Sequence, residues 1–289
     1  MKRLLPIFGA ITTALLGFAL YEALIGAPTE QTMGNVQRIF YYHVSSAWTA
    51  FILFFLNFVA SVLYLVRKND SQGLKDRLAN WVVIALGIIT CIAAYLIKLP
   101  DGIERSSVAS TGIAAVCIYF LVRKYFPEDR GDALAVTTAE VGVVFCTVVL
   151  VTGPLWARPV WGIWWAPGDV RLTSTLVLWL IYVSYLILRR FSSSGQTPKI
   201  AAVLAVFGAL DVPLVYFSIW FFRTQHPQPV IGDGGSIDPR MLHVLLLNWL
   251  AFSCFAALLC WARYRLEVLR REVDETLALE SLLEPRGSR

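Results

Sequence analysis

Hydrophobic residues gather in eight long runs along the chain, separated by shorter polar segments. The runs cover residues 4–26, 47–66, 78–99, 107–122, 133–153, 172–188, 200–222 and 241–262. A helix needs about 20 mainly apolar residues to cross the roughly 30 Å hydrocarbon core of a bilayer. The pattern therefore predicts an all-α, polytopic membrane bundle of about eight transmembrane helices, in which the fourth and sixth runs are the shortest.

The composition agrees with this pattern and excludes several classes of protein. The 289 residues are 57% hydrophobic and only 16% charged, whereas soluble globular chains are about 45–50% apolar and about 25% charged. Disorder, a fibrous chain, a disulfide scaffold and most soluble enzyme folds are thereby excluded. The net charge of +5 is better explained by membrane topology than by nucleic-acid binding, because cytoplasmic loops carry an excess of Lys and Arg.

The Lys and Arg residues also predict an orientation. With the amino terminus in the cytoplasm, 18 of the 25 fall on the inner side, and the outer side holds only Arg38, Lys98, Arg105, Arg158, Arg171, Arg223 and Arg240. Eight spans then leave both termini in the cytoplasm. We expect residues 1–262 to form the transmembrane domain. The charged tail of residues 263–289 has apolar periodicity and is predicted to be a cytoplasmic helix with solvated faces.

Three segments on the predicted outer side hold most of the polar chemistry: residues 27–46, 154–171 and 223–240. All three histidines of the chain, His43, His226 and His243, lie in these segments or within one helical turn of them. Neutral imidazole is the commonest metal ligand, so two histidines from different segments could bind a metal ion or a haem iron. The alternative is an interfacial histidine bonded to backbone or to lipid headgroups.

Tryptophans concentrate in the second of these segments. Four lie within ten residues, with prolines and glycines between them: Trp156, Trp161, Trp164 and Trp165. An aromatic belt at the membrane surface explains one or two per span end, but not four in one loop. Because Pro and Gly disfavour a long helix, we expect a turn-rich ledge of indoles suited to a planar aromatic ligand. Asp169 and Arg171 close this ledge, and Arg is the natural partner of a carboxylate. Haem combines a planar ring, an iron and two propionates. The histidines, the tryptophan ledge and Arg171 therefore point together to haem as the ligand.

The remaining reactive residues point to no other chemistry. The five cysteines, Cys91, Cys117, Cys146, Cys254 and Cys260, lie inside predicted spans without a CxxC or CxxCH motif, so neither dithiol chemistry nor covalent c-type haem attachment is expected. Asp211 lies in the middle of the seventh run, two residues before Pro213. It is a candidate for a helix cap or for a proton relay. Glu140, in the fifth run, has no evident role.

The outer segments resemble one known family. The stretch Trp161-Gly162-x-Trp164-Trp165, followed by Asp169-x-Arg171-Leu172-Thr173, is similar to the tryptophan-rich WWD signature of haem-handling proteins in cytochrome c biogenesis. The match is best with the CcmC family of haem exporters and with the related CcsA proteins. YYHVSSAW resembles the histidine segment before the second span, and SIWFFRTQHPQ resembles the segment that carries the second external ligand.

The chain departs from the family pattern in two places. Pro167-Gly168 replace the tryptophan that usually precedes the aspartate of the motif. Typical members have six spans, so residues 78–126 are interpreted as an inserted hairpin of two extra spans. An even number of extra spans leaves both histidines on the outer side.

The resemblance implies a function in haem delivery. His43 and His226 would be the axial ligands of a non-covalently bound haem b, and Trp161, Trp164, Trp165, Asp169 and Arg171 would form its binding surface in the loop of residues 154–172. The protein would lie in the bacterial inner membrane, with the haem site on the periplasmic side. It would pass haem to the periplasmic chaperone CcmE, with the small membrane protein CcmD and an ABC transporter of the same pathway as further partners. No catalytic residue is expected, and nucleic acid is not an expected partner.

Three other functions stay open at this point. A CcsA-type subunit of a cytochrome c synthase would attach haem directly to the apocytochrome and would then act as a haem lyase. A multi-pass transporter could use the Asp211–Pro213 break as its binding site. A membrane scaffold would use the tryptophan loop only as an interfacial anchor.

Overall fold

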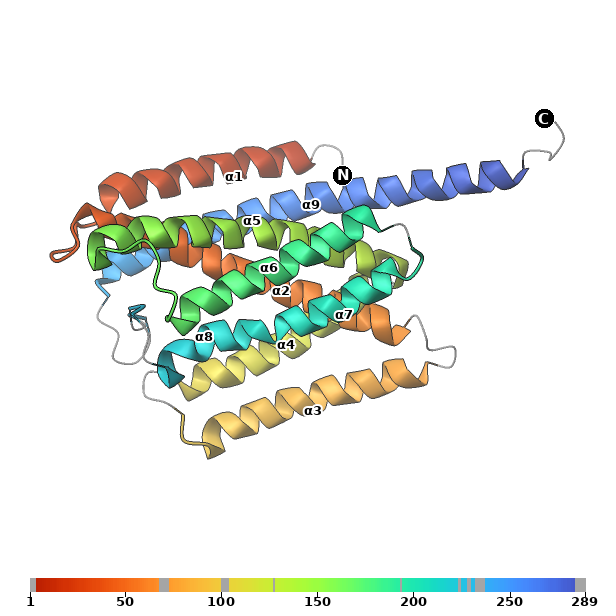
Figure 1. The fold of residues 1–289 in the computed structure, drawn as a ribbon, viewed down its shortest axis with the longest axis horizontal. Coiled ribbons are helices and arrows are strands. Elements are labelled where there is room, and N and C mark those ends of the chain that lie inside the picture. The colour runs from red at the N-terminus through yellow and green to blue at the C-terminus, as the bar shows by residue number, and fades with distance from the viewer. Residues whose placement is uncertain are drawn as a thin grey trace.

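The computed structural model describes residues 4–67, 73–99, 104–126, 128–192, 194–222, 225–227, 230–231 and 237–283. The elements in these ranges are helices (Figure 1): α1 (Leu4–Tyr21), a π-helical turn (Glu22–Gly26), a 3-10 turn (Asn35–Arg38), α2 (Ile39–Arg67), α3 (Leu74–Leu96), α4 (Arg105–Tyr125), α5 (Glu128–Trp161), α6 (Val170–Phe191), α7 (Thr197–Ala209), α8 (Asp211–Phe221) and α9 (Pro239–Leu283). Eight helical segments of the described chain are long and apolar enough to cross a membrane, with α7 and α8 together forming one of them. The predicted all-α bundle with eight spans is confirmed.

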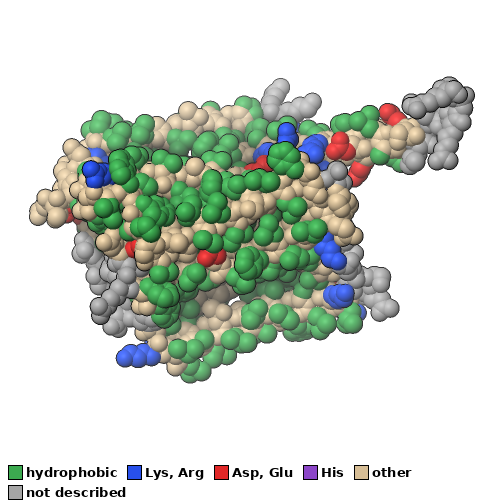
Figure 2. All heavy atoms as spheres, viewed as in Figure 1, with side chains coloured by type: hydrophobic (Ala, Val, Ile, Leu, Met, Phe, Trp, Pro, Cys, Tyr) green, Lys and Arg blue, Asp and Glu red, His purple; other side chains and the backbone are tan. Residues whose placement is uncertain are grey.

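The surface of the bundle is that of a multi-pass membrane protein. Large apolar side chains are exposed on most helices, among them Trp81, Leu96 and Phe207. On the face shown in Figure 2, hydrophobic side chains cover most of the bundle, and Lys and Arg side chains lie toward its two ends. Such apolar faces are stable in lipid, where the hydrocarbon replaces water around them.

Helix α2 lies at the centre of the bundle and packs most extensively on α5, with further contacts to α7 and α9. At the core, the ring of Phe54 stacks on that of Tyr182 with 3.8 Å between centroids, and aromatic pairs contribute about 0.5–1.5 kcal/mol beyond the burial of their area. Gly142 of α5 makes room for this pair, because a Cβ there would lie 2.7 Å from the Phe54 ring. The position of α2, which carries His43, is therefore fixed from several sides.

Two helices extend further than the sequence predicts. The 3-10 turn and α2 make residues 35–46 helical, although they were assigned to an outer segment. The prediction of a ledge without a long helix from Pro154 onward was wrong, since α5 continues through Pro154 and Pro159 to Trp161. Each proline removes one hydrogen bond, but the neighbouring bonds continue the helix. Gly162 ends it with a φ of +77° and donates its N–H to the carbonyl of Arg158 at 3.0 Å.

The pair of helices α3 and α4 stands apart from the rest of the bundle. These helices contact each other more than they contact α2, and α3 lies at the edge of the molecule (Figure 1). Gly87 and Gly112 let the two backbones approach, because a Cβ at Gly87 would lie 2.4 Å from the side chain of Val116. That this pair is an inserted hairpin, at residues 78–126, stays a prediction.

At the end of the bundle opposite the histidines, α9 is joined to α5 and α6 by ion pairs. Arg189 binds Asp132 through two hydrogen bonds of 2.7 Å, and Arg271 binds the same carboxylate at 2.8 Å. Glu267 lies between Arg263 and Arg271, and Arg263 also pairs with Glu140. The tail of α9 was predicted to have solvated faces. Most of the tail is exposed, including residues 272–281, but Glu267 at its start is only 6% exposed. Glu140 acquires a partner that the sequence did not reveal.

Candidate functional site

A large cavity opens at the end of the bundle where the histidines lie. Its volume is about 910 Å³, and it is lined by residues of α2, α4, α5, α6, α8 and α9 together with the segments that precede α2, α4 and α9. Small-molecule sites usually measure about 300–1,000 Å³, so this cavity suits a large ligand. Its deeper wall is apolar and reaches Phe51 of α2 and Val149 of α5. The cavity can therefore hold an extended apolar molecule with its polar groups near the mouth.

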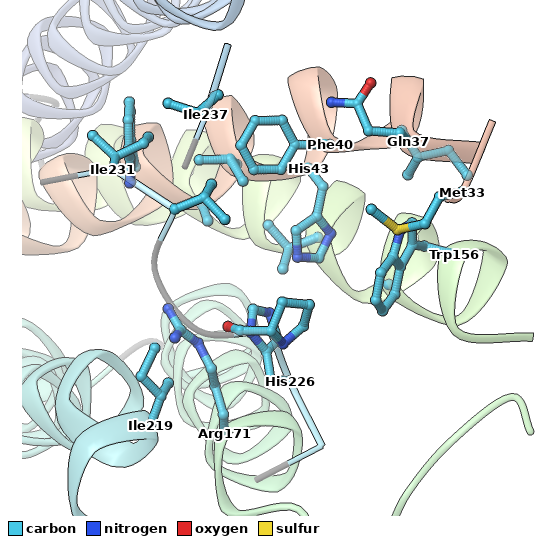
Figure 3. A pocket seen from close by; sticks show the side chains of 18 of the residues that line it. Met33, Gln37, Phe40, His43, Trp156, Arg171, Ile219, His226, Ile231 and Ile237 are labelled. Carbon is cyan, nitrogen blue, oxygen red and sulfur yellow. The ribbon is translucent and has the colours of Figure 1, made fainter. Parts of the chain in front are cut away.

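His43 and His226 face each other across this cavity (Figure 3). Their ring centroids are 6.5 Å apart and the rings are tilted by 34°. Metal–imidazole bonds are about 2 Å long, so two rings that share one metal ion have centroids roughly 6 Å apart. The two side chains, which are 183 positions apart in the sequence, thus lie at the distance that a shared ion requires.

The hydrogen bonds of His43 determine which of its ring nitrogens is free. The Thr152 hydroxyl donates to the carbonyl of Val148 at 2.7 Å, and its oxygen lies 2.9 Å from Nδ1 of His43. Since the single hydroxyl proton is already used, Nδ1 must carry the hydrogen and donate it to Thr152. Nε2 then keeps its lone pair and can bind a metal.

The same reasoning gives the same tautomer for His226. Its Nδ1 lies 3.0 Å from the carbonyl oxygen of Pro227, which can only accept. Burial, followed by the positive charge of Arg171, lowers the pKa of His226 from 6.5 to about 4. The imidazole is therefore neutral at pH 7, with a free lone pair on Nε2.

The tryptophans do not all lie where the sequence placed them. Trp161 and Trp165 line the cavity, together with Trp48, Trp156 and Trp220. The rings of Trp156 and Trp161 meet edge to face, with centroids 5.2 Å apart. Trp164 is 56% exposed and is not among the residues that line the cavity. It lies beyond Gly162, where α5 ends. No sequence pattern distinguishes Trp164 from its neighbour Trp165.

Asp169 has a different environment from the one the sequence suggested. It is only 3% exposed and is not among the cavity residues. Its Oδ1 accepts the N–H of Leu172 at 3.1 Å and so caps the first turn of α6. Its Oδ2 accepts the N–H groups of Gln225 and His226 at 2.7 and 3.3 Å. Asp169 thus joins the start of α6 to the segment that carries His226.

Arg171 lines the cavity next to His226 (Figure 3). Within the described part of the chain, its guanidinium donates no hydrogen bond and has no ion-pair partner, although Asp169 and Tyr216 lie near enough to act on it electrostatically. Arg171 is half-buried, and a cation without an acceptor in a mainly apolar cavity gains from an anionic partner. The site is therefore prepared for an anionic group of a ligand, and a carboxylate matches the geometry of Arg best.

The other candidates from the sequence lie outside this site or at its edge. His243 is exposed and does not line the cavity. Asp211 begins α8 but makes no side-chain cap, and its Oδ2 has no hydrogen-bond partner among the described residues. Cys146 lines the inner wall, and all five cysteines are free thiols. Arg223 lies outside the described residues.

Sequence reasoning missed several residues around the site. Thr152 lies near the end of an apolar run, inside a helix where a hydroxyl usually bonds only to its own helix. Gln37, Met33 and Phe40 line the cavity beside His43. The helical spacing of Gln37 and Phe40 from His43 could have indicated these two only if the second helix had been extended back to residue 35, and Met33 lies before that helix.

Comparisons with known proteins give one consistent result. The family model CcmC, heme exporter protein C, matches residues 104–279. Heme exporter protein C of Bradyrhizobium diazoefficiens is 29% identical over 274 residues, which cover 94% of this chain and 81% of that protein. The protein of the same name from Escherichia coli K12 is 33% identical over 180 residues, or 62% of this chain and 73% of its own length. A putative cytochrome c biosynthesis ccmC-like mitochondrial protein of Arabidopsis thaliana is 28% identical over 256 residues, which cover 88% of this chain and 75% of that protein. The family match includes the part of the chain that carries Trp161, Asp169, Arg171 and His226.

Proposed function

The chain belongs to the heme exporter protein C family, and from this premise we propose that it binds haem in the cavity between His43 and His226 and passes it to another protein. Membership of the family assigns the chain to haem handling in cytochrome c maturation. The axial ligands, the form of the haem and the route of transfer are the proposed part.

The observation that carries the proposal is the pair of imidazoles 6.5 Å apart with both Nε2 atoms free. Among the described residues, no group of three or more His, Cys, Asp or Glu could hold a metal ion. Two imidazoles alone leave a transition metal incompletely coordinated. A porphyrin supplies four equatorial nitrogens, so haem is the ligand for which exactly two opposed histidines are sufficient.

The walls of the cavity suit the rest of the haem molecule. Trp156, Trp161 and Trp165 supply apolar aromatic surface against the porphyrin ring. Arg171, next to His226, would bind one propionate, because a carboxylate gives its guanidinium the partner that it lacks among the described residues. With no CxxCH motif in the sequence, binding is non-covalent and the haem is of the b type, as transfer to another protein requires.

The direction of transfer follows from the predicted topology. The excess of Lys and Arg on the opposite side supports a location of the histidine end of the bundle at the periplasmic face of the bacterial inner membrane. The acceptor would be the periplasmic chaperone CcmE, with CcmD and the ABC transporter of the same pathway as partners in the membrane. The proposal that these proteins are its partners rests on the family resemblance.

The visible spectrum of the detergent-purified protein, expressed with sufficient haem, tests the proposal. We expect a six-coordinate low-spin spectrum with a bis-histidine signature, and a large loss of bound haem in His43→Ala and in His226→Ala. His243→Ala is the matched control and should keep wild-type haem, because His243 lies outside the cavity. Wild-type haem content and spectrum in both ligand variants would contradict the assignment.

Arg171→Gln tests the propionate contact separately. We expect the variant to bind haem roughly 10- to 100-fold more weakly, because hydrogen bonds to charged groups contribute about 1.5–3 kcal/mol. The dimethyl ester of haem is the control ligand, since it lacks both carboxylates. Binding titrations should give equal affinities of the wild type and the variant for the ester, and an equal loss for both ligands would contradict the contact.

A further inference from the structure

Asp169 belongs to the tryptophan-rich motif, yet it is buried and is not among the residues that line the cavity. We propose that Asp169 is a positioning residue that holds His226 in place as the second ligand of the haem iron. This inference rests on the proposed function. It gives Asp169 an indirect role, in contrast to the direct haem contact expected from the sequence.

The two oxygens of the Asp169 carboxylate bind different parts of the chain. Oδ1 caps α6 by accepting the N–H of Leu172 at 3.1 Å. Oδ2 accepts from the backbone of Gln225 at 2.7 Å and from that of His226 at 3.3 Å, across 56 and 57 positions of sequence. The side chain is buried, and bonds to a carboxylate in such surroundings are stronger than those between neutral groups.

The segment of His226 has few other attachments. Residues 225–227 are not helical, and among the described residues the ring of His226 bonds only to the carbonyl of its neighbour Pro227. Within the described residues, the bonds to Asp169 are the only hydrogen bonds that join this segment to another element. The distance of 6.5 Å between the two imidazoles therefore depends on this carboxylate.

The same hydrogen bonds of Asp169 also hold Arg171 in position relative to His226. Arg171 lies in the first turn of α6, which Asp169 caps. The carboxylate is occupied by three backbone N–H groups and makes no ion pair with Arg171 among the described residues, which leaves the guanidinium for the ligand. One buried side chain thus sets the positions of a ligand to the iron and of a partner for a propionate.

Asp169→Asn separates the two tasks. Asn is as good a helix cap as Asp, but in place of Oδ2 it presents an NH₂ group, which cannot accept from Gln225 or His226. We expect a mixed spectrum, in which part of the low-spin haem becomes five-coordinate and high-spin on His43 alone. Affinity should fall about 10- to 100-fold, as is typical when a metal ligand loses its outer partner. Added imidazole should restore the low-spin form.

Amide hydrogen exchange of the haem-free protein provides an independent measurement. In Asp169→Asn, the amides of residues 225 and 226 should exchange faster, while those in the first turn of α6 stay at wild-type rates. Asp169→Ser, which keeps a cap but is too short to reach the segment, should behave in the same way. If the wild-type protein lacks a bis-histidine spectrum, the proposed function fails. Amide hydrogen exchange then still tests whether Asp169 holds the backbone of Gln225 and His226.

A double-mutant cycle distinguishes positioning from general stabilisation of the fold. In a His226→Ala background, Asp169→Asn should reduce haem affinity no further, because the ligand that it positions is already gone. Equal reductions in the presence and absence of His226 would overturn the inference. A wild-type spectrum and wild-type exchange in Asp169→Asn would overturn it as well.

Discussion

The two imidazoles that meet in the cavity are held in contrasting ways. His43 lies on α2, a helix of 29 residues at the centre of the bundle, and its ring bonds to Thr152 of another long helix. His226 lies on a short non-helical segment, and within the described part of the chain its ring bonds only to its neighbour Pro227. One half of the site is therefore built on rigid secondary structure, and the other half on a segment tied down by one carboxylate.

The difference suits the proposed transfer of haem to another protein. A site with both ligands on packed helices would bind haem tightly but release it slowly, because opening such elements requires much of the global unfolding free energy. A ligand on a weakly attached segment can leave the iron without disturbing the bundle. We expect release to begin at His226, while His43 keeps the haem oriented until the acceptor binds it.

The largest expected effect is an asymmetry between His43→Ala and His226→Ala. Loss of His43 should reduce haem affinity by more than the roughly 10- to 100-fold that follows loss of an outer partner of a ligand. Loss of His226 should leave a measurable fraction of five-coordinate haem on His43. Binding titrations with optical detection give both affinities. Equal losses, or a larger loss in His226→Ala, would contradict the view that the helix carries the anchoring ligand.

Thr152→Val should have an intermediate effect. The variant keeps the shape of the side chain and removes the acceptor that fixes the Nδ1–H tautomer of His43. We expect haem affinity to fall by about tenfold, the lower end of the range for such outer partners. Thr138→Val is the matched control on the same helix, because its hydroxyl bonds only to carbonyls of that helix. If both variants lost the same affinity, the loss would reflect the helix and not the histidine.

Gly153→Ala should have the smallest effect and tests how closely α5 approaches the His43 ring. A Cβ at Gly153 would lie 3.5 Å from Cε1 of His43, which is an ordinary van der Waals contact. We expect haem affinity within about twofold of the wild type, since no displacement is needed. Gly153→Val, with two further methyl groups, should push the ring and lower the affinity more. If Gly153→Ala already shifted the spectrum, the wall around His43 would be tighter than its geometry indicates.

Hydropathy predicted the helices well, because bilayer thickness fixes their length and lipid tolerates no other backbone structure. The site was harder to predict. Both histidines lie at one cavity, as their place on one side of the membrane suggests. The directions of Trp164 and Asp169 depend on the turn at Gly162 and on a contact with a segment 56 positions away. No local pattern contains such information. Similarly, Pro154 and Pro159 lie inside a helix whose tertiary contacts outweigh their local preference.

The ion pairs at the other end of α9 have a consequence for how the chain enters the membrane. Arg189, Arg263 and Arg271 belong to the basic excess that predicts the orientation, yet in the folded protein all three are paired with Asp132, Glu140 or Glu267. Insertion responds to Lys and Arg and only weakly to acidic residues. We therefore expect these arginines to direct insertion while the chain is being made, before they form the ion pairs that join the helices of the folded bundle.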